Sequence, residues 1–189
     1  MRHCLRTPAG RLSVHRLHQD LKSQGHGVAK DALHAMLGHL VDGFLVSAVP
    51  LATESERRRN SNPRKIYPAD PGLIRAFDAS GRANLGPSLE TVVLNELERR
   101  GADVAYVKTA SGFEVDFLAR YPGGEQELIQ VCADLSDTTT RTRELRALED
   151  ASGDYPGATR RLLVLDRDSL AQAGPLPFTA EPVSEWLLG

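Results

Sequence analysis

The chain has 189 residues and a mass of 20.6 kDa, which is enough for one or two small domains. Its 41% hydrophobic and 25% charged residues exclude an intrinsically disordered chain, and a net charge of −2 excludes a uniformly basic surface. No apolar run approaches the roughly 18 residues that a membrane span needs, and the start of the sequence does not resemble a signal peptide. Two cysteines, Cys4 and Cys132, are too few for a disulfide framework and favour a reducing, cytoplasmic setting.

Charge is distributed unevenly along the chain. Residues 1–80 contain 12 Lys and Arg against 7 Asp and Glu, a net charge of +5, whereas residues 81–189 have a net charge of −7. All six histidines lie in the first of these segments. A small, polar, Gly-containing stretch over 78–84 predicts a boundary between them. We therefore expect two domains, 1–80 and 81–189, with different partners.

The first segment has the element order of a winged helix-turn-helix. Its predicted elements are a helix between Ser13 and Gly25, a helix between Gly27 and Gly43, a strand over 44–49, a polar loop over 53–63 and an extended stretch over 65–67. In a winged helix, the second of these helices is the one offered to a DNA groove.

A cluster of basic residues occupies the polar loop and the start of the extended stretch. Five cations lie within nine residues: Arg57, Arg58, Arg59, Arg64 and Lys65. This density predicts a phosphate-binding patch for duplex DNA. Lys30 and His34, one turn apart on the second helix, are expected to face outward with the patch. An acidic protein partner remains the alternative, because winged helices also serve as protein-docking modules.

Two further features have the residue types of a metal site or of a redox nucleophile, but the sequence shows no further residues that would complete either site. His15 and His18 have the i, i+3 spacing that can bind a metal on a helix. Because no third ligand is in view, we expect ordinary surface or core histidines. Cys132 lies within a predicted strand without a nearby histidine, so we expect a buried structural thiol rather than a redox nucleophile.

The second segment predicts an α/β domain. Its expected elements are a helix from Ser88 to Arg100, strands over 104–108, 113–118 and 127–133, a helix over 140–149, a strand over 161–166 and a tail that docks Trp186. Glu90 falls on the apolar side of the first helix, where a carboxylate is costly unless it is paired or metal-bound. Strand alternation places Glu114 and Asp116 on one face of the second strand.

The order of these elements is that of metal-dependent nucleases of the PD-(D/E)XK type. Such enzymes need an acid near the end of one strand and an acid-x-Lys pair on the next, where the acids hold Mg²⁺ and the lysine orients the attacking water. Asp116 takes the first position and Glu90 the supporting helix position, so these two are the candidate metal ligands.

The third strand departs from this nuclease pattern. Gln130 and Cys132 stand where the acid and the lysine are needed, so we expect poor metal affinity and no fixed positive charge. Glu114 or Asp134 could replace the missing acid, and Lys108 on a neighbouring strand could replace the lysine. The site is therefore expected to be a degenerate one, formed by Glu90, Asp116, Gln130, Cys132 and Lys108.

Several stretches together resemble a known family. They are NPRKIYPADPGL at 62–73, LETVVLNEL at 89–97, GFEVDF at 112–117, LIQVC at 128–132 and TRTRELRAL at 140–148. These stretches resemble the C-terminal half of a large group of prokaryotic AAA-type ATPases, which is known as domain of unknown function 4143. The resemblance covers nearly the whole chain. It implies a winged helix and a degenerate PD-(D/E)XK-like domain that follow a P-loop ATPase domain.

The chain contains no G-x-x-x-x-G-K-[ST] motif, so we expect no ATP chemistry from these residues. It is expected to be either a fragment of a longer ATPase or a short protein that kept the accessory half.

Three functional hypotheses follow. The leading one is a non-catalytic module that binds duplex DNA or regulates a P-loop ATPase domain, with no cofactor beyond weakly bound Mg²⁺. The second is a Mg²⁺- or Mn²⁺-dependent nuclease that uses Glu90, Asp116 and Lys108. The third is a protein-interaction adaptor whose cations dock an acidic partner.

Overall fold

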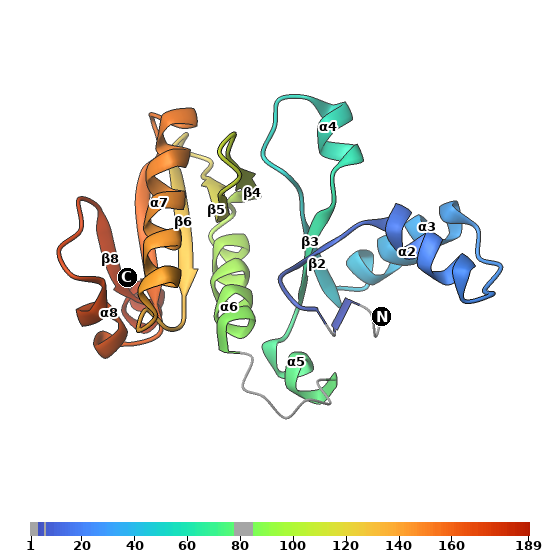
Figure 1. Cartoon of the computed structure of the whole chain (residues 1–189), viewed down its shortest axis with the longest axis horizontal. Coiled ribbons are helices and arrows are strands. Elements are labelled where there is room, and N and C mark those ends of the chain that lie inside the picture. The colour runs from blue at the N-terminus through green and yellow to red at the C-terminus, as the bar shows by residue number, and fades with distance from the viewer. Residues whose placement is uncertain (1–3, 6, 78–84) are drawn as a thin grey trace. The chain divides into compact units, whose positions relative to one another are not determined.

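The chain divides into two compact units, Met1–Ala83 and Asn84–Gly189 (Figure 1). The structure is a computed structural model that describes residues 4–5, 7–77 and 85–189. The boundary predicted over 78–84 lies outside the described residues. Each unit combines helices with a sheet of its own, so the mixed α/β class is confirmed. None of the described helices has both the length and the apolar character that crossing a bilayer requires.

The first unit is built on a three-stranded antiparallel sheet in the order β1-β3-β2. Its elements are β1 (Gly10–Leu12), α2 (Val14–Ser23), α3 (Lys30–Asp42), β2 (Val46–Val49), α4 (Glu56–Ser61), β3 (Arg64–Pro68) and α5 (Pro71–Phe77). The two longer helices and two of the strands occur where the sequence predicts them. The short strand β1 and the helices α4 and α5 were not predicted, and α4 lies inside the predicted polar loop.

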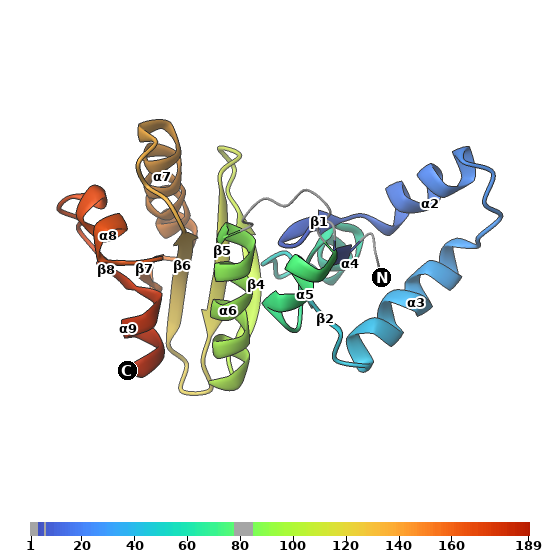
Figure 2. The same cartoon turned by 90° about the horizontal axis from the view of Figure 1, so that it is seen from below.

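The first unit buries little of its helical surface. The small core cluster includes Cys4, Val46 and Ile66, with α3 contributing half-buried apolar residues such as Leu37 and Val41. Among the described residues of α2, none is buried. Ser13 caps α2 as predicted, because its hydroxyl accepts the N–H of Arg16 at 3.3 Å. Figure 2 shows α2 and α3 diverging from the loop that joins them.

The second unit is built on a five-stranded sheet in the order β4-β5-β6-β7-β8. Its elements are α6 (Leu85–Arg99), β4 (Asp103–Lys108), β5 (Glu114–Arg120), β6 (Gln126–Cys132), α7 (Thr138–Asp154), β7 (Thr159–Val164), α8 (Arg167–Ala173), β8 (Thr179–Pro182) and α9 (Val183–Leu188). The first three strands pair antiparallel, whereas β6, β7 and β8 run parallel. Parallel neighbours need crossover connections, and α7 and α8 provide them.

Every element predicted for the second segment occurs, although with different limits. The helix α6 begins at Leu85 rather than after Ser88, because Pro87 is tolerated in the first turn of a helix, where no N–H is required. Asp137 begins α7 earlier than predicted, since its carboxylate accepts the N–H of Thr140 at 2.8 Å. The short elements α8, β8 and α9 were not predicted, but the expected burial of Trp186 is confirmed.

Candidate functional site

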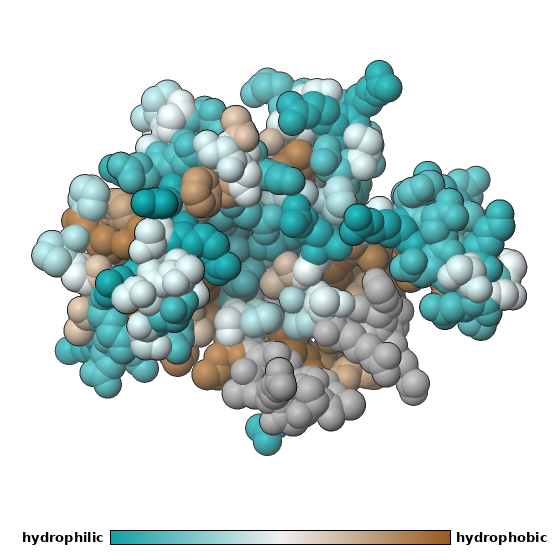
Figure 3. All heavy atoms as spheres, in the orientation of Figure 1, coloured by the Kyte–Doolittle hydropathy of each residue, from teal (hydrophilic) through white to brown (hydrophobic). Residues whose placement is uncertain are grey.

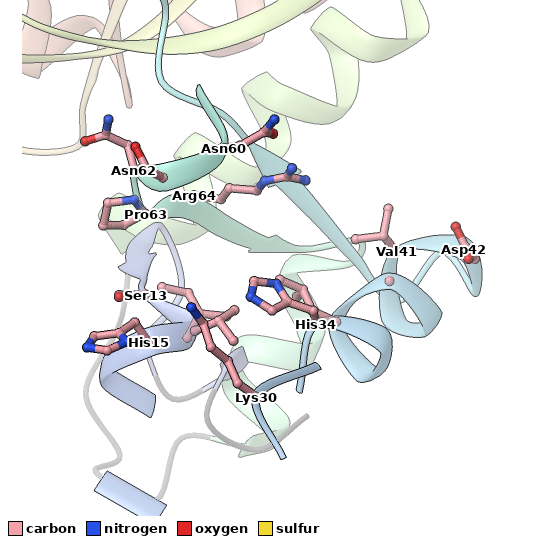
Figure 4. Close-up of a pocket in the computed structure, with 15 residues that line it drawn as sticks. Ser13, His15, Lys30, His34, Val41, Asp42, Asn60, Asn62, Pro63 and Arg64 are labelled. Carbon is pink, nitrogen blue, oxygen red and sulfur yellow. The ribbon is translucent and has the colours of Figure 1, made fainter. Parts of the chain in front are cut away.

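A groove in the first unit brings together residues from α2, α3 and the start of β3. It has a volume of about 680 Å³. Ser13, Val14 and His15 line it from the start of α2, and residues 60–64 line it from the end of α4 to the start of β3. Figure 4 shows Lys30 and His34 projecting from α3 into the space between these two segments. The groove is therefore a hollow within one unit, lined by several basic side chains.

Local structure explains why the basic side chains meet in this groove. Lys30 and His34 are four residues apart on α3, so they lie on one face of the helix. Arg64 is the exposed first residue of β3 and lines the groove opposite them. The predicted placement of these three residues on one outward surface is therefore found in the structure.

The three consecutive arginines lie beside the groove rather than in it. Arg57, Arg58 and Arg59 are exposed on α4, whose first turn is capped by the hydroxyl of Ser55, which accepts the N–H of Arg58 at 3.3 Å. The same short helix continues into the segment Asn60–Arg64 that lines the groove. These arginines are therefore exposed cations on the helix that leads into the lining of the groove.

Lys65 does not belong to this basic surface, and its predicted place in the patch is wrong. Its side chain is only 3% exposed and lies over the ring of Tyr67, 5.8 Å from the centroid. The physical reason is the position of β3 at the centre of the sheet. Lys65 is paired with Arg11 on one side and with Val49 on the other. A residue covered from both neighbouring strands is not available to a phosphate.

The second unit contains a buried polar cluster between β5, β6 and α7. The N–H of Asp116 donates to Gln130 Oε1 at 3.3 Å, and Asp116 Oδ2 accepts the N–H of Val131 at 3.1 Å. Gln130 Nε2 donates to Glu144 Oε2 of α7 at 2.5 Å. Asp116, Gln130 and Glu144 are 7%, 4% and 8% exposed, respectively. The predicted proximity of Asp116 and Gln130 is found, and Glu144 joins them from the helix.

Arg143 supplies a positive charge to this cluster. Its guanidinium donates two hydrogen bonds to Glu144 Oε1, at 2.5 and 3.2 Å. These bonds and the charge of Glu144 raise the pKa of Arg143, with smaller contributions from Cys132 and Asp116. Arg143 and Glu144 were not predicted as site residues. The buried positions Ala147, Leu148 and Ala151 of α7 were the available signal, because Glu144 lies one turn before them.

Cys132 stands beside the cluster as an uncharged thiol. Burial raises its pKa to about 11, and the nearby carboxylates of Glu144 and Asp116 act in the same direction. Its sulfur donates to the backbone carbonyl of Asp134 at 3.1 Å. A backbone hydrogen bond from Asp134 partly offsets the rise in pKa. At neutral pH the sulfur is therefore in its protonated, weakly nucleophilic form. The expected burial of Cys132 is found.

The remaining predicted site residues lie at the margins of the second unit's sheet. Glu90 is half-buried in the first half of α6, and Lys108 is exposed at the end of β4, where its register partner is Glu114. The contacts described above join Asp116 to Gln130 and Val131 rather than to Glu90 or Lys108. The predicted metal pair of Glu90 and Asp116 therefore receives no support from these contacts.

The donor groups of the cluster do not fit a Mg²⁺ site. Both carboxylate oxygens of Glu144 already accept hydrogen bonds, and Asp116 Oδ2 accepts a backbone N–H. Within the described ranges, no group of three or more His, Cys, Asp or Glu side chains is arranged to hold a metal ion. A cation bound here would have to compete with these buried hydrogen bonds for the carboxylate oxygens.

The buried carboxylate of α6 is Glu96 rather than Glu90. Glu96 accepts hydrogen bonds from Arg99 and Arg100, and the bond from Arg99 is the main cause of a pKa lowered to about 2, which burial opposes. Arg100 also donates to the backbone carbonyl of Trp186 at 2.8 Å and stacks over its ring. Glu96 therefore serves packing, because it fixes the arginine against which α9 docks.

Comparisons with known proteins yield no relative of this chain. No protein-family model matches it, and searches of curated proteins and of solved structures find no match. The family resemblance drawn from the sequence therefore stays a prediction. The groove of the first unit and the polar cluster of the second are the two candidate sites from which a function is argued.

Proposed function

We propose that the chain is a non-catalytic, DNA-binding regulatory module whose first unit acts as a winged helix. The observation that carries the proposal is the groove in which Lys30 and His34 of α3 face Arg64 of β3. Cationic side chains from separate elements around one hollow are suited to the evenly spaced phosphates of duplex DNA. The exposed Arg57, Arg58 and Arg59 on the neighbouring wing extend this surface.

The topology of the first unit supports the same assignment. Two helices precede a β2–β3 hairpin, β1 closes the sheet, and α4 forms part of the hairpin connection. In this arrangement α3 is the helix presented to a DNA groove, while the wing contacts the neighbouring backbone. Space-filling Figure 3 shows mainly hydrophilic residues on the visible surface of α2 and α3. This polar character suits a nucleic acid better than an apolar partner.

The second unit supports the non-catalytic half of the proposal. If this unit is a degenerate nuclease-like domain, as the sequence predicts, a neutral amide, Gln130, and a thiol, Cys132, replace the acid and the lysine that cleavage requires. Glu144 and Arg143 are paired with each other, and the Asp116 carboxylate accepts the N–H of Val131. We propose that this unit is a scaffold. The family resemblance suggests a P-loop ATPase domain as the partner that the module serves.

The proposal is tested by measuring duplex binding as a function of salt. We expect a fluorescent 20-bp duplex to bind with a slope of log affinity against log salt near −4.5, about 0.9 for each of five contacted phosphates. The double variant Lys30→Gln/Arg64→Gln should flatten this slope by about 1.8 for any DNA sequence. The matched control is Lys22→Gln/Arg75→Gln, which removes the same charge from exposed residues that do not line the groove.

Two results would overturn DNA binding as the function. One is the absence of binding at 25 mM salt, and the other is an equal loss in the test and control variants. Retention of a protein partner by a pull-down that is insensitive to added nuclease, together with absent DNA binding, would favour the adaptor hypothesis.

The nuclease hypothesis is tested separately, with plasmid and branched DNA in the presence of Mg²⁺ or Mn²⁺. We expect both substrates to stay intact, because no lysine and no free pair of carboxylates faces the reacting position in the cluster described above. Cleavage by the wild type that disappears in Asp116→Asn would replace the non-catalytic assignment with that of a nuclease.

A further inference from the structure

Two histidines line the groove together with its permanent cations. His15 comes from the first turn of α2, and His34 comes from α3, one turn beyond Lys30. Figure 4 shows both rings at the same hollow as Lys30 and Arg64. Among the described lining residues, the one carboxylate is Asp42, near the end of α3. The titratable and charged groups that face the groove are thus two imidazoles, two permanent cations and one acid.

The chemistry of imidazole makes this combination responsive to pH. Histidine is the side chain that ordinarily changes charge between pH 5 and 8. The neutral ring offers one N–H donor, whereas the imidazolium offers two donors and a positive charge. A phosphodiester stays anionic throughout this range, so only the protein side of the contact changes. A phosphate held near Lys30 and Arg64 gains charge-assisted hydrogen bonds when a neighbouring imidazole is protonated.

We propose that His15 and His34 are phosphate contacts that act in their protonated form, and that they make DNA binding at the groove pH-dependent. This inference rests on the proposed DNA-binding function and deepens it by naming the regulation of the same site. Binding and protonation are then reciprocal. Lower pH tightens DNA binding, and bound DNA takes up protons onto the two rings.

The test measures the affinity for a 20-bp duplex from pH 6.0 to 8.5 at constant ionic strength. For the wild type we expect the affinity to rise about tenfold per histidine toward pH 6.0, since a charge-assisted hydrogen bond contributes about that factor. The salt slope should steepen by about 0.9 for each protonated ring that contacts a phosphate. Calorimetry in buffers of different ionisation enthalpy should show proton uptake on DNA binding near pH 7.

The variant His15→Asn/His34→Asn should lose the pH dependence, the steeper salt slope and the proton uptake. The matched control, His26→Asn/His39→Asn, removes two exposed histidines that do not line the groove and should behave as the wild type. Circular dichroism at each pH verifies that every variant is folded.

The outcomes separate this inference from the proposed function. No binding at any pH at low salt overturns the DNA-binding function itself. Binding with equal affinity, equal salt slope and no proton uptake across the pH range overturns the inference and leaves DNA binding in place. Persistence of the pH dependence in His15→Asn/His34→Asn also overturns the inference, because the titrating groups then lie elsewhere.

Discussion

The two units of this chain use charged residues in opposite ways. In the first unit, Lys30, His34 and Arg64 are exposed around a hollow. In the second, Arg143 and Glu144 are paired with each other and connected through Gln130 to Asp116. Charged and polar side chains therefore form an exposed basic surface in the first unit and a closed hydrogen-bonded network in the second.

This difference shows that the chemistry of a polar residue depends on the hydrogen bonds and ion pairs that it already makes within the protein. A carboxylate that accepts hydrogen bonds from its own protein has little capacity left for a metal or a substrate, and opening it costs free energy. An exposed cation beside a groove has no such cost. The comparison supports the proposal that the first unit binds a ligand and that the second is a scaffold, and each prediction below tests one side of it.

The largest loss of stability is expected from a substitution of Gln130, which breaks the closed network. The substitution Gln130→Ala leaves the Glu144 carboxylate without its buried donor, leaves the Asp116 N–H without its acceptor and creates a cavity. We expect the free energy of unfolding of the second unit to fall by about 3 kcal/mol. Urea denaturation followed by the fluorescence of Trp186, the single tryptophan of the chain, measures this unit directly.

The matched control for this prediction is Gln126→Ala, at the start of the same strand, where the side chain is only half-buried. We expect a change below about 0.5 kcal/mol for this substitution. Similar losses in the two variants would mean that the network contributes nothing beyond ordinary packing, and the contrast between the units would lose its basis.

The second-largest effect is expected at Glu96, which two arginines hold in its ionised form. The substitution Glu96→Gln should lower the free energy of unfolding by about 2 kcal/mol at neutral pH. Its pKa is about 2 in the folded chain against an ordinary value of 4.5. The ionised form therefore stabilises the fold above pH 4.5, and this contribution is lost as the pH falls from 4.5 toward 2. The stability difference between wild type and Glu96→Gln should narrow over this range.

Urea denaturation of the wild type and of Glu96→Gln at several pH values measures how the stability difference between them changes. Glu98→Gln, which removes an exposed carboxylate from the same helix, should give a small and nearly constant difference. A stability difference between wild type and Glu96→Gln that stays constant with pH would show that the fold does not lower the pKa of Glu96.

Much of the fold could be predicted because it is encoded in local patterns. The alternation of Phe113, Val115 and Phe117 indicates a strand with one apolar face, and the apolar spacing of α3 and α6 indicates helices. The elements that were missed, such as β1, α4 and β8, are too short to show a period. Their formation depends on tertiary pairing, as when β1 adds to the edge of β3.

Residues of the candidate sites could be predicted to lie together only if they are close in sequence or on neighbouring strands. The spacing of Lys30 and His34 is enough to place them on one face, and neighbouring strands are enough to bring Asp116 beside Gln130. The burial of Lys65 depends on which strand is central. The contribution of Glu144 depends on how α7 docks, and the burial of Glu96 on the docking of α9. None of these arrangements is encoded in a local pattern.

The third prediction compares two neighbouring cations on β3. Arg64→Gln should lower the affinity for duplex DNA about tenfold at 50 mM salt, equivalent to about 1.4 kcal/mol, and should flatten the salt slope by about 0.9. Lys65→Gln should leave that slope unchanged, because the buried ammonium over Tyr67 reaches no phosphate. Instead it should lower the stability of the first unit by up to about 1 kcal/mol. Equal changes in salt slope for the two variants would contradict the assignment of Arg64 to the groove.

The smallest effect is expected at Arg143, the cation of the closed network. Its side chain is 64% exposed, so solvent screens its pairing with Glu144, and Arg143→Gln should lower the stability of the second unit by less than about 1 kcal/mol. Because its charge is already paired with a carboxylate, the same variant should bind duplex DNA within twofold of the wild type, in contrast to Arg64→Gln.

The control for Arg143 is Arg146→Gln, which removes an exposed cation from the same helix, and a double-mutant cycle with Glu144→Gln isolates the energy of the pair. A loss of DNA affinity in Arg143→Gln but not in Arg146→Gln would mean that the cluster of the second unit opens to bind nucleic acid. In that case the division between an open and a closed unit would fail, and the cluster would become a second contact for DNA.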